Sequence, residues 1–152
     1  MKRARIIYNP TAGREQFRKE LPDVLDKLEK AGYETSAHAT NGEGDATEAA
    51  RKAVERKHDL VVIAGGDGTI NEVIQGIAEA DYRPKIGIIP AGTTNDFARA
   101  LAIPKDTLQA VDIILENKVK ALDIGKVNDK YFINIAGGGD LTELTYDVPI
   151  KM

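Results

Sequence analysis

The sequence predicts an α/β fold, a three-layer sandwich in which a mostly parallel, doubly wound sheet lies between helices. Two observations predict this fold. Strand-like apolar runs alternate with segments of helical apolar periodicity over residues 1–116, an order that favours a parallel sheet with right-handed crossovers. The run at 60–64 is apolar throughout, as expected of a strand that is covered on both faces.

The first strand-helix unit occupies residues 5–32. A short buried strand is expected at 5–8, and Pro10 follows its end. A helix is expected at 17–28, where apolar residues share one face, and Gly32 is expected to end it. Pro22 lies inside this pattern and indicates either a kink or a new helix start with proline in the first turn.

Further units follow along the chain up to residue 116. The expected strands are 33–39, 60–64 and 85–89, and the expected helices are 45–54, 70–77, 96–101 and 108–115. Asp45 and Glu48 have the spacing of a capping box, so we expect them to begin their helix.

The pattern changes after residue 120. Strands are expected at 121–127 and 131–136 around the two-residue turn Asn128-Asp129, and again in the Thr-rich run 141–146. We therefore predict an α/β domain at 1–120, and at 121–152 a β-hairpin segment that begins an incomplete, antiparallel second domain. These strands either fold back on the first sheet or mark the chain as the N-terminal piece of a longer protein, and the pattern favours the longer protein.

Unpaired strand edges in this last segment would invite self-association. We expect residues after 120 to pair between two chains, as in a homodimer, or to be poorly ordered.

Composition narrows the function. The chain has 21 Lys and Arg against 24 Asp and Glu, whereas nucleic-acid binders carry a basic surplus. The absence of cysteine excludes a disulfide, a thiolate nucleophile and a Cys-type zinc site. No stretch approaches the ~18 apolar residues of a membrane span, and the N-terminus lacks the apolar region of a signal peptide. A cytoplasmic location with at most peripheral membrane contact is expected.

Glycines gather in the loops that follow expected strands. Eight of the 14 do so: Gly13, Gly65, Gly66, Gly68, Gly92, Gly137, Gly138 and Gly139. The carboxyl ends of parallel strands line the ligand crevice of such sheets, and glycine lets a ligand approach the backbone closely. A single glycine is explained by chain turning, but three such loops on one edge indicate a ligand site.

The loop at 64–69 runs directly into the helix that is expected from Ile70. Its amides and the helix N-terminus favour an anion, although the pattern is neither a Walker A loop nor a dinucleotide fingerprint. Asp67 among these amides indicates Mg²⁺ that bridges to phosphate oxygens. Alternatively, Asp67 only caps the helix, and the residues alone do not separate the two roles.

Two further loops and one side chain belong to the same edge. Thr93, Thr94 and Asn95 offer uncharged donors for phosphate or ribose, or act as helix caps. The loop Asn9–Gly13 follows the first strand, where sugar or phosphate often binds in doubly wound folds, and Thr40 follows the second.

These motifs resemble a known family. Residues 65–69 (Gly-Gly-Asp-Gly-Thr) with Asn71-Glu72 resemble a motif that is shared across the superfamily of diacylglycerol, sphingosine, ceramide and NAD kinases. Residues 90–99 and 8–13 resemble the diacylglycerol kinase catalytic family, specifically its bacterial soluble lipid kinases. The likeness covers essentially the whole chain.

The resemblance implies the NAD kinase/diacylglycerol kinase-like fold and an ATP-dependent lipid kinase that converts diacylglycerol to phosphatidic acid with ATP and Mg²⁺. Asp67 would be catalytic through metal and phosphate organisation. The implied nucleotide-binding residues are Asn9, Pro10, Thr11, Ala12, Gly13, Thr40, Gly66, Asp67, Gly68, Thr69, Ile70, Asn71, Glu72 and Thr93. No protein ligand of a metal is expected in this chain, because the family's general base and structural Mg²⁺ site lie later in its sequences.

The resemblance also implies the partners. The lipid acceptor would enter between this domain and a β-sandwich domain, and the full-length protein would be peripheral at the inner face of the membrane. Phosphoryl transfer needs no nucleophile from the protein. The alternatives are a kinase for another hydroxyl lipid, a kinase for NAD, against which residues 95–99 argue, or a catalytically incomplete ATP-binding fragment.

Overall fold

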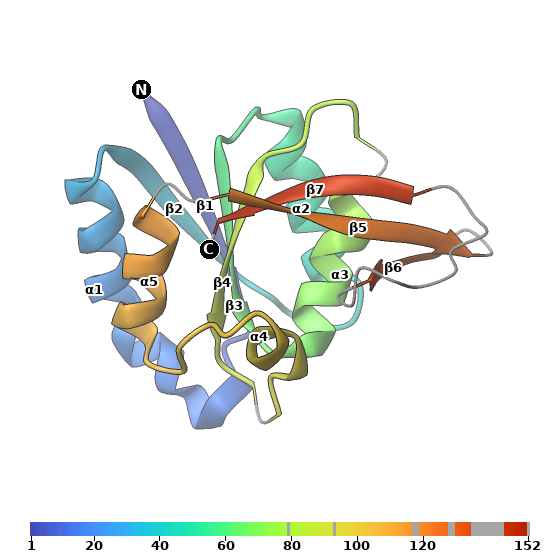
Figure 1. Ribbon diagram of the computed structural model, residues 1–152. Helices are drawn as coiled ribbons and strands as arrows, with labels where there is room; N and C mark the ends of the chain where they lie inside the picture. The colour runs from blue at the N-terminus through green and yellow to red at the C-terminus, as the bar shows by residue number, and fades with distance from the viewer. Residues whose placement is uncertain (79, 93, 117–118, 128–129, 135–144, 152) are drawn as a thin grey trace.

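In the residues that the structure describes, seven strands form one sheet in the order β2-β1-β3-β4-β7-β5-β6. The computed structural model describes residues 1–78, 80–92, 94–116, 119–127, 130–134 and 145–151 (Figure 1). The strands are β1 (Lys2–Tyr8), β2 (Tyr33–Ala39), β3 (Leu60–Gly65), β4 (Lys85–Pro90), β5 (Val119–Val127), β6 (Lys130–Asn134) and β7 (Thr145–Lys151). The helices are the 3-10 turn η1 (Ala12–Glu15), α1 (Gln16–Lys30), α2 (Asp45–Glu55), α3 (Asp67–Ile77), α4 (Asp96–Ala100) and α5 (Thr107–Leu115).

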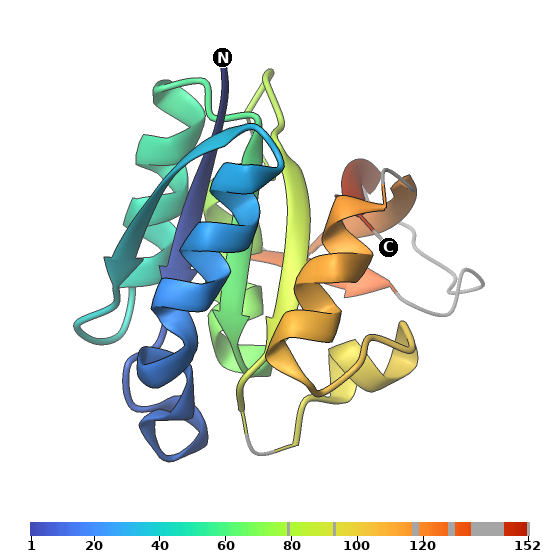
Figure 2. The ribbon, with the colours of Figure 1, turned by 90° about the vertical axis from the view of Figure 1, so that its left-hand side faces the viewer.

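The first four strands are parallel and lie between two helical layers. Helices α1 and α5 cover one face of the sheet, while α2 and α3 cover the other (Figures 1 and 2). Strand β3 is buried along its whole length, because it lies between β1 and β4 and under both layers. The expected α/β sandwich with a mostly parallel sheet is confirmed.

Helix α1 is continuous through Pro22, which is its seventh residue. The expectation that Pro22 starts a new helix is therefore wrong. Pro22 is exposed, so the carbonyl of Arg18, which loses its i+4 donor, is on the solvent side of the helix, where water can replace the bond.

Helix α2 begins without the expected capping box. Gly44 occupies the N-cap position with φ 85°, and Asp45 is the first helical residue. The Asp45 carboxylate turns back to the Asn41 N–H (3.0 Å) and the His38 imidazole (2.8 Å). A capping box requires Asp45 itself at the N-cap, and the left-handed Gly44 takes that place.

Helix α3 begins at Asp67, three residues before the expected start at Ile70. Gly66 is its N-cap in extended conformation, and its carbonyl accepts a hydrogen bond from the Ile70 N–H (3.1 Å). The glycines predict a loop for this Gly-Asp-Gly-Thr stretch, yet most of it forms the first helical turn.

The last three strands join the first sheet. Strand β5 pairs antiparallel with β6, Val127 opposite Lys130, and residues 128–129 of the expected hairpin turn lie outside the described residues. Strand β7 pairs antiparallel with β5 and parallel with β4 through Ile86 and Ile150. These strands pair within one chain, and the expected pairing between two chains stays a prediction.

Some expectations for this region lie outside the described residues. They are the glycine triplet 137–139 and residues 141–144 of the Thr-rich run, of which only 145–146 are in β7. The domain boundary at residue 120 stays a prediction.

Candidate functional site

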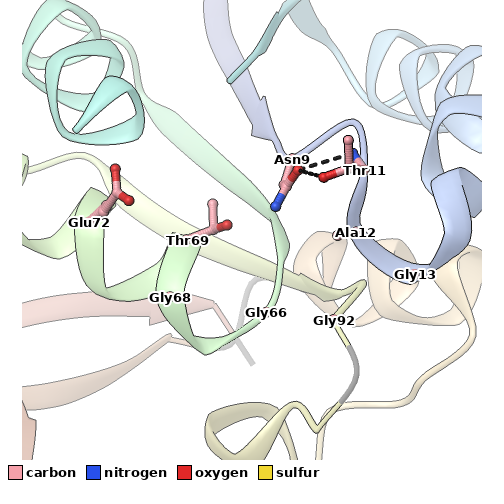
Figure 3. A pocket seen from close by; sticks show the side chains of 9 residues that line it. All are labelled: Asn9, Thr11, Ala12, Gly13, Gly66, Gly68, Thr69, Glu72 and Gly92. Atoms are coloured by element: carbon pink, nitrogen blue, oxygen red, sulfur yellow. Dashed lines mark hydrogen bonds between the residues drawn. The ribbon is translucent and has the colours of Figure 1, made fainter. Parts of the chain in front are cut away.

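The carboxyl ends of β1, β3 and β4 surround a pocket of about 700 Å³. Its lining comprises Asn9, Thr11, Ala12, Gly13, Gly66, Gly68, Thr69, Glu72 and Gly92 (Figure 3). The chain leaves β1 toward β2 on one side and continues through β3 and β4 on the other. The pocket therefore lies at the topological switch point, where doubly wound folds bind their ligands.

A second pocket of about 530 Å³ adjoins the first and shares Asn9, Thr11, Thr69 and Glu72 with it. Its far wall is formed by the loop at 40–43, which follows β2. Thr40 is anchored to the sheet because its N–H donates to the Tyr8 carbonyl (2.9 Å). Together the two pockets form a site that is long enough to extend from β4 to β2.

The loop after β1 is held in one conformation by its own side chains. The Asn9 Oδ1 accepts hydrogen bonds from the Thr11 N–H (3.0 Å) and the Thr11 hydroxyl (2.8 Å), as Figure 3 shows. Gly13 has φ 57°, and a Cβ there would lie 2.8 Å from the Ala91 carbonyl oxygen. Glycine is therefore required where this loop approaches the end of β4.

The loops after β3 and β4 are in direct backbone contact. A Cβ on Gly92 would lie 2.5 Å from the Cα of Gly66, and the Ala91 N–H donates to the Gly65 carbonyl (3.1 Å). Gly66 precedes the first turn of α3, whose N–H groups have no acceptor within the helix. This end of the pocket thus presents backbone donors and the positive end of a helix dipole.

Asp67 connects α3 to α4 and does not line either pocket. Its two carboxylate oxygens accept hydrogen bonds from the N–H groups of Phe97 and Asp96, both at 2.9 Å. Burial alone would raise the pKa of Asp67. The hydrogen bonds from Phe97, Asp96 and Thr94 and the positive charge of Arg99 together outweigh burial and hold this pKa below its ordinary value. Of the two roles left open, capping is what the structure shows, although the capped helix is α4 and not α3.

Asn95 does not cap α4 with its side chain, in contrast to the capping alternative for Asn95 and Thr94. It stands at the N-cap position with φ 50° and is buried. Its side chain binds Gly92 twice at 2.9 Å, accepting from the N–H and donating to the carbonyl. The Thr94 hydroxyl is 3.4 Å from Asp67, so residues 94–97 are linked to both Gly92 and Asp67.

The lining of the larger pocket is almost uncharged. Among its described residues Glu72 is the one ionisable side chain, and none is Lys or Arg. The Glu72 Oε1 accepts a hydrogen bond from the Gly44 N–H (2.9 Å). Over the part of the chain that the structure describes, no three His, Cys, Asp or Glu side chains come together as a metal site, so these residues do not fit a metal held by the protein alone.

Most of the predicted site residues are brought together. Asn9, Thr11, Ala12, Gly13, Gly66, Gly68, Thr69 and Glu72 line the larger pocket, and Pro10 and Thr40 line the second. Ile70 is buried in the core. The Asn71 side-chain Oδ1 accepts a hydrogen bond from the Gln75 Nε2 on the exposed side of α3 (3.3 Å). Thr93 lies outside the described residues. That these residues bind nucleotide stays a prediction.

Sequence reasoning missed part of the lining. The sequence indicates Gly92 as a loop glycine but not as a site residue. In the wall of the second pocket it indicates Thr40 alone, whereas Asn41, Gly42, Glu43 and Ala46 also line it. The glycines at 42 and 44 were the available signal, since they mark a loop that turns sharply directly after Thr40.

The family model of the diacylglycerol kinase catalytic domain matches residues 3–127. The chain belongs to this family. The matched range contains every described residue of both pockets. Family membership thus agrees with the resemblance in residues 8–13, 65–72 and 90–99.

Individual relatives and a crystal structure agree with the family. The chain is 64% identical over 153 residues to a diacylglycerol kinase of Bacillus subtilis (strain 168), covering 100% of this chain and 50% of the relative. It is 60% identical over 151 residues to one of Staphylococcus aureus (strain bovine RF122 / ET3-1), covering 99% and 48%. A crystal structure of a diacylglycerol kinase from Bacillus anthracis (strain Sterne) matches with a TM-score of 0.78 and 34% identity, covering 86% of this chain and 45% of that one.

The chain therefore spans about half the length of the curated relatives it matches. Within the described residues, the helices are too short or too polar to cross a bilayer.

Proposed function

We propose that this chain carries the ATP-binding part of an ATP-dependent kinase that phosphorylates diacylglycerol. The γ-phosphoryl group would pass from ATP to the lipid hydroxyl, giving phosphatidic acid and ADP, and a general base would accept the hydroxyl proton. The supporting observation is the switch-point pocket of a family member, built from backbone groups and small uncharged side chains at the N-terminus of α3.

The two adjoining pockets suit the two ends of one nucleotide. The triphosphate would occupy the larger pocket, where Gly66, Gly68 and Thr69 present the first turn of α3. The base and ribose would occupy the second pocket, against Thr40 and the loop that follows it. Residues 9–13 border both, and Thr93, next to Gly92, is retained as a phosphate contact.

The charges of the lining set a requirement for this binding mode. A triphosphate carries several negative charges, yet the described lining offers no Lys or Arg and holds the carboxylate of Glu72. Mg²⁺ that arrives with ATP would neutralise the phosphoryl oxygens. The chain's own contribution is to orient the nucleotide through backbone donors and the dipole of α3.

Asp67 would support this site by holding a neighbouring backbone segment in place. Its carboxylate fixes the N–H groups of Asp96 and Phe97, and so holds the segment that continues from Gly92 beside the phosphate pocket. A catalytic role through metal and phosphate organisation remains part of the proposal. The lipid acceptor, peripheral contact with the inner face of the membrane and a homodimer belong to the proposal for the whole protein.

Calorimetric titration of the chain with ATP, in Mg²⁺ and in EDTA, tests the binding part. We expect Mg²⁺-dependent binding of one ATP per chain. Absence of binding would overturn the assignment of the pocket.

Incubation with γ-labelled ATP and diacylglycerol, sphingosine or NAD tests the reaction. Label in diacylglycerol supports the proposed kinase, and label in sphingosine or NAD assigns another acceptor. ATP binding without transfer of label identifies this chain as an ATP-binding fragment. The kinase activity of a full-length relative, measured in the same assay, is then the positive control.

A matched pair of variants ties the binding to this pocket. Gly66→Val places a branched side chain at the phosphate end, where a Cβ already lies 3.2 Å from Gly92, and should abolish ATP binding. Glu34→Ala changes an exposed residue of β2 at the opposite end of the sheet and should leave binding unchanged.

A further inference from the structure

The loop at 40–44 forms one wall of the second pocket but is weakly constrained by its own sequence. Residues 41–44 are exposed, and Gly42 and Gly44 have φ values of 151° and 85°. Glycine loses more backbone freedom on ordering than any other residue. The position of this wall must therefore be set by contacts from outside the loop.

Glu72 of α3 supplies the first of these contacts. Its Oε1 accepts a hydrogen bond from the Gly44 N–H at 2.9 Å. The two helices that carry the pair are locked together, because the Thr47 hydroxyl donates to the Glu72 carbonyl (2.8 Å) and Gly76 packs against the Thr47 carbonyl oxygen, where a Cβ would lie at 2.4 Å. Glu72 thus holds the end of the loop from a rigid support.

Asp45 of α2 supplies the second contact, near the start of the loop. Its Oδ2 accepts the Asn41 N–H at 3.0 Å and is 2.8 Å from the His38 Nε2. The hydrogen bond with His38 lowers the pKa of Asp45. Asp45 lines neither pocket of the site, so any effect it has there must pass through the loop.

We propose that Glu72 and Asp45 are positioning residues that fix the 40–44 loop as the wall selecting the nucleoside end of the ligand. This inference rests on the proposed nucleotide-binding function. Glu72 acts through Gly44 and not through the phosphates, since a carboxylate beside a triphosphate repels it. Without either carboxylate a backbone N–H loses its acceptor and the loop gains freedom that nucleoside binding must then remove.

The test compares two probes that share the phosphate chemistry. ATP and inorganic tripolyphosphate are titrated calorimetrically, both in Mg²⁺, into the unaltered chain and into Glu72→Ala and Asp45→Ala. A hydrogen bond to a charged group corresponds to about tenfold or more in affinity. We expect both variants to lose about that factor for ATP relative to tripolyphosphate. The tripolyphosphate affinity should change less than about twofold in Asp45→Ala, and it should stay the same or rise in Glu72→Ala, because that change removes a carboxylate that repels the phosphates.

Conservative variants and a matched control separate positioning from folding. Glu72→Gln and Asp45→Asn keep an acceptor oxygen at each place and should recover most of the ATP affinity. Glu48→Ala removes an exposed carboxylate of α2 that pairs with Arg51 and lines neither pocket of the site, so both affinities should stay unchanged.

Backbone hydrogen exchange of the ligand-free chain gives a readout that needs no nucleotide. Exchange of the Asn41 and Gly44 amides should rise in the alanine variants and return toward the original rate in Glu72→Gln and Asp45→Asn. Unchanged exchange would overturn the positioning role. Equal losses for ATP and tripolyphosphate in Glu72→Ala would assign Glu72 to the phosphates, and full ATP affinity in Asp45→Ala would remove the loop from nucleoside selection.

The failure of the proposed function has a different signature. If the unaltered chain binds neither ATP nor tripolyphosphate, the assignment of the site to a nucleotide fails. Nucleoside selection by the 40–44 loop then fails as well, even if hydrogen exchange shows that Glu72 and Asp45 hold the loop.

Discussion

Asp67 accepts two backbone hydrogen bonds from a helix 29 residues further along the chain, and this makes its ionisation part of the stability. Its folded pKa lies below the ordinary value of 3.8. For a carboxyl with a lowered folded pKa, the stabilisation is fully present above the unfolded pKa and is lost as the pH falls through the folded pKa.

We therefore expect Asp67→Asn to be less stable than the original chain at pH 7, and the difference to shrink as the pH falls below about 4. Urea unfolding of both chains from pH 7 to pH 3 measures it. A difference that stays constant over this range would show that the charge of Asp67 does not stabilise α4.

Gly92 is the point at which the loops after β3 and β4 meet. A Cβ there would lie 2.5 Å from Gly66 Cα and 3.0 Å from Asn95 Oδ1. Gly92→Ala should lower the free energy of unfolding by about 1–3 kcal/mol and weaken ATP binding, because the phosphate end of the pocket must widen.

Gly68→Ala provides the matched control for Gly92→Ala. A Cβ on Gly68 has open space around it, so this variant should lose no stability in the same urea titration, and the higher helix propensity of alanine should raise its unfolding free energy. Equal stability of both variants would contradict the close approach of the two loops.

At this scale the sequence identified the right residues but not their partners. Asp67 was placed at a helix start and Asn95 at a capping position, which local patterns can predict. The Asp67 carboxylate instead serves α4, and Asn95 binds Gly92. Such contacts depend on how two loops meet at the sheet edge, and no periodicity in the sequence encodes that distance.

Among the elements, helices α2 and α3 approach each other so closely at Gly76 that a side chain there would collide with α2. The Gly76 Cα faces the Thr47 carbonyl oxygen and the Ala50 side chain, with room for no Cβ. Gly76→Ala gains about 1 kcal/mol of helix propensity, but overpacking typically costs about 1–3 kcal/mol.

We expect a net loss of stability in Gly76→Ala, together with faster exchange of the Gly44 amide as Glu72 shifts. Thermal unfolding and hydrogen exchange measure the two effects. A more stable variant with unchanged exchange would show that the helices separate easily.

The elements themselves were largely predictable. Apolar runs located β1, β3 and β4, the alternation of large and small residues located β2, and helical periodicity located α1, α2 and α5. These patterns follow from which face of each element is buried. The start of α3 was wrong. The start of α2 at Asp45 was right, but its expected capping box is absent, because Gly44 takes the N-cap position in a backbone conformation that a sequence pattern does not specify.

For the whole molecule, β7 determines whether β4 is a sheet edge. In the folded chain β4 lies between β3 and β7, and five of its six residues are buried. A fragment that ends at residue 118 would leave the β4 edge unpaired, and open edges of apolar strands promote association.

We expect this fragment to form concentration-dependent oligomers, whereas the 152-residue chain should show far less association. Size-exclusion chromatography with light scattering at several concentrations measures both. A compact, monomeric fragment would instead support the domain boundary that the sequence predicts at residue 120.

The sequence pattern could not predict the position of β7 in the sheet. Its pairing with β4 joins Ile86 to Ile150, and a hairpin-like tail carries no local signal for which distant edge it will meet. The parallel half of the sheet was predictable because each crossover follows the handedness rule, which does not apply to the tail.

The strand order also dictates an order of assembly. Strand β7 follows the other six strands in the chain, yet it separates β4 from β5 and β6, which precede it. The β5–β6 hairpin can form early from neighbouring residues, but it can attach to the rest of the sheet only when β7 enters between them. Truncation before Thr145 should therefore leave the β5–β6 hairpin detached from the four parallel strands, which hydrogen exchange of the Lys130–Asn134 amides can measure.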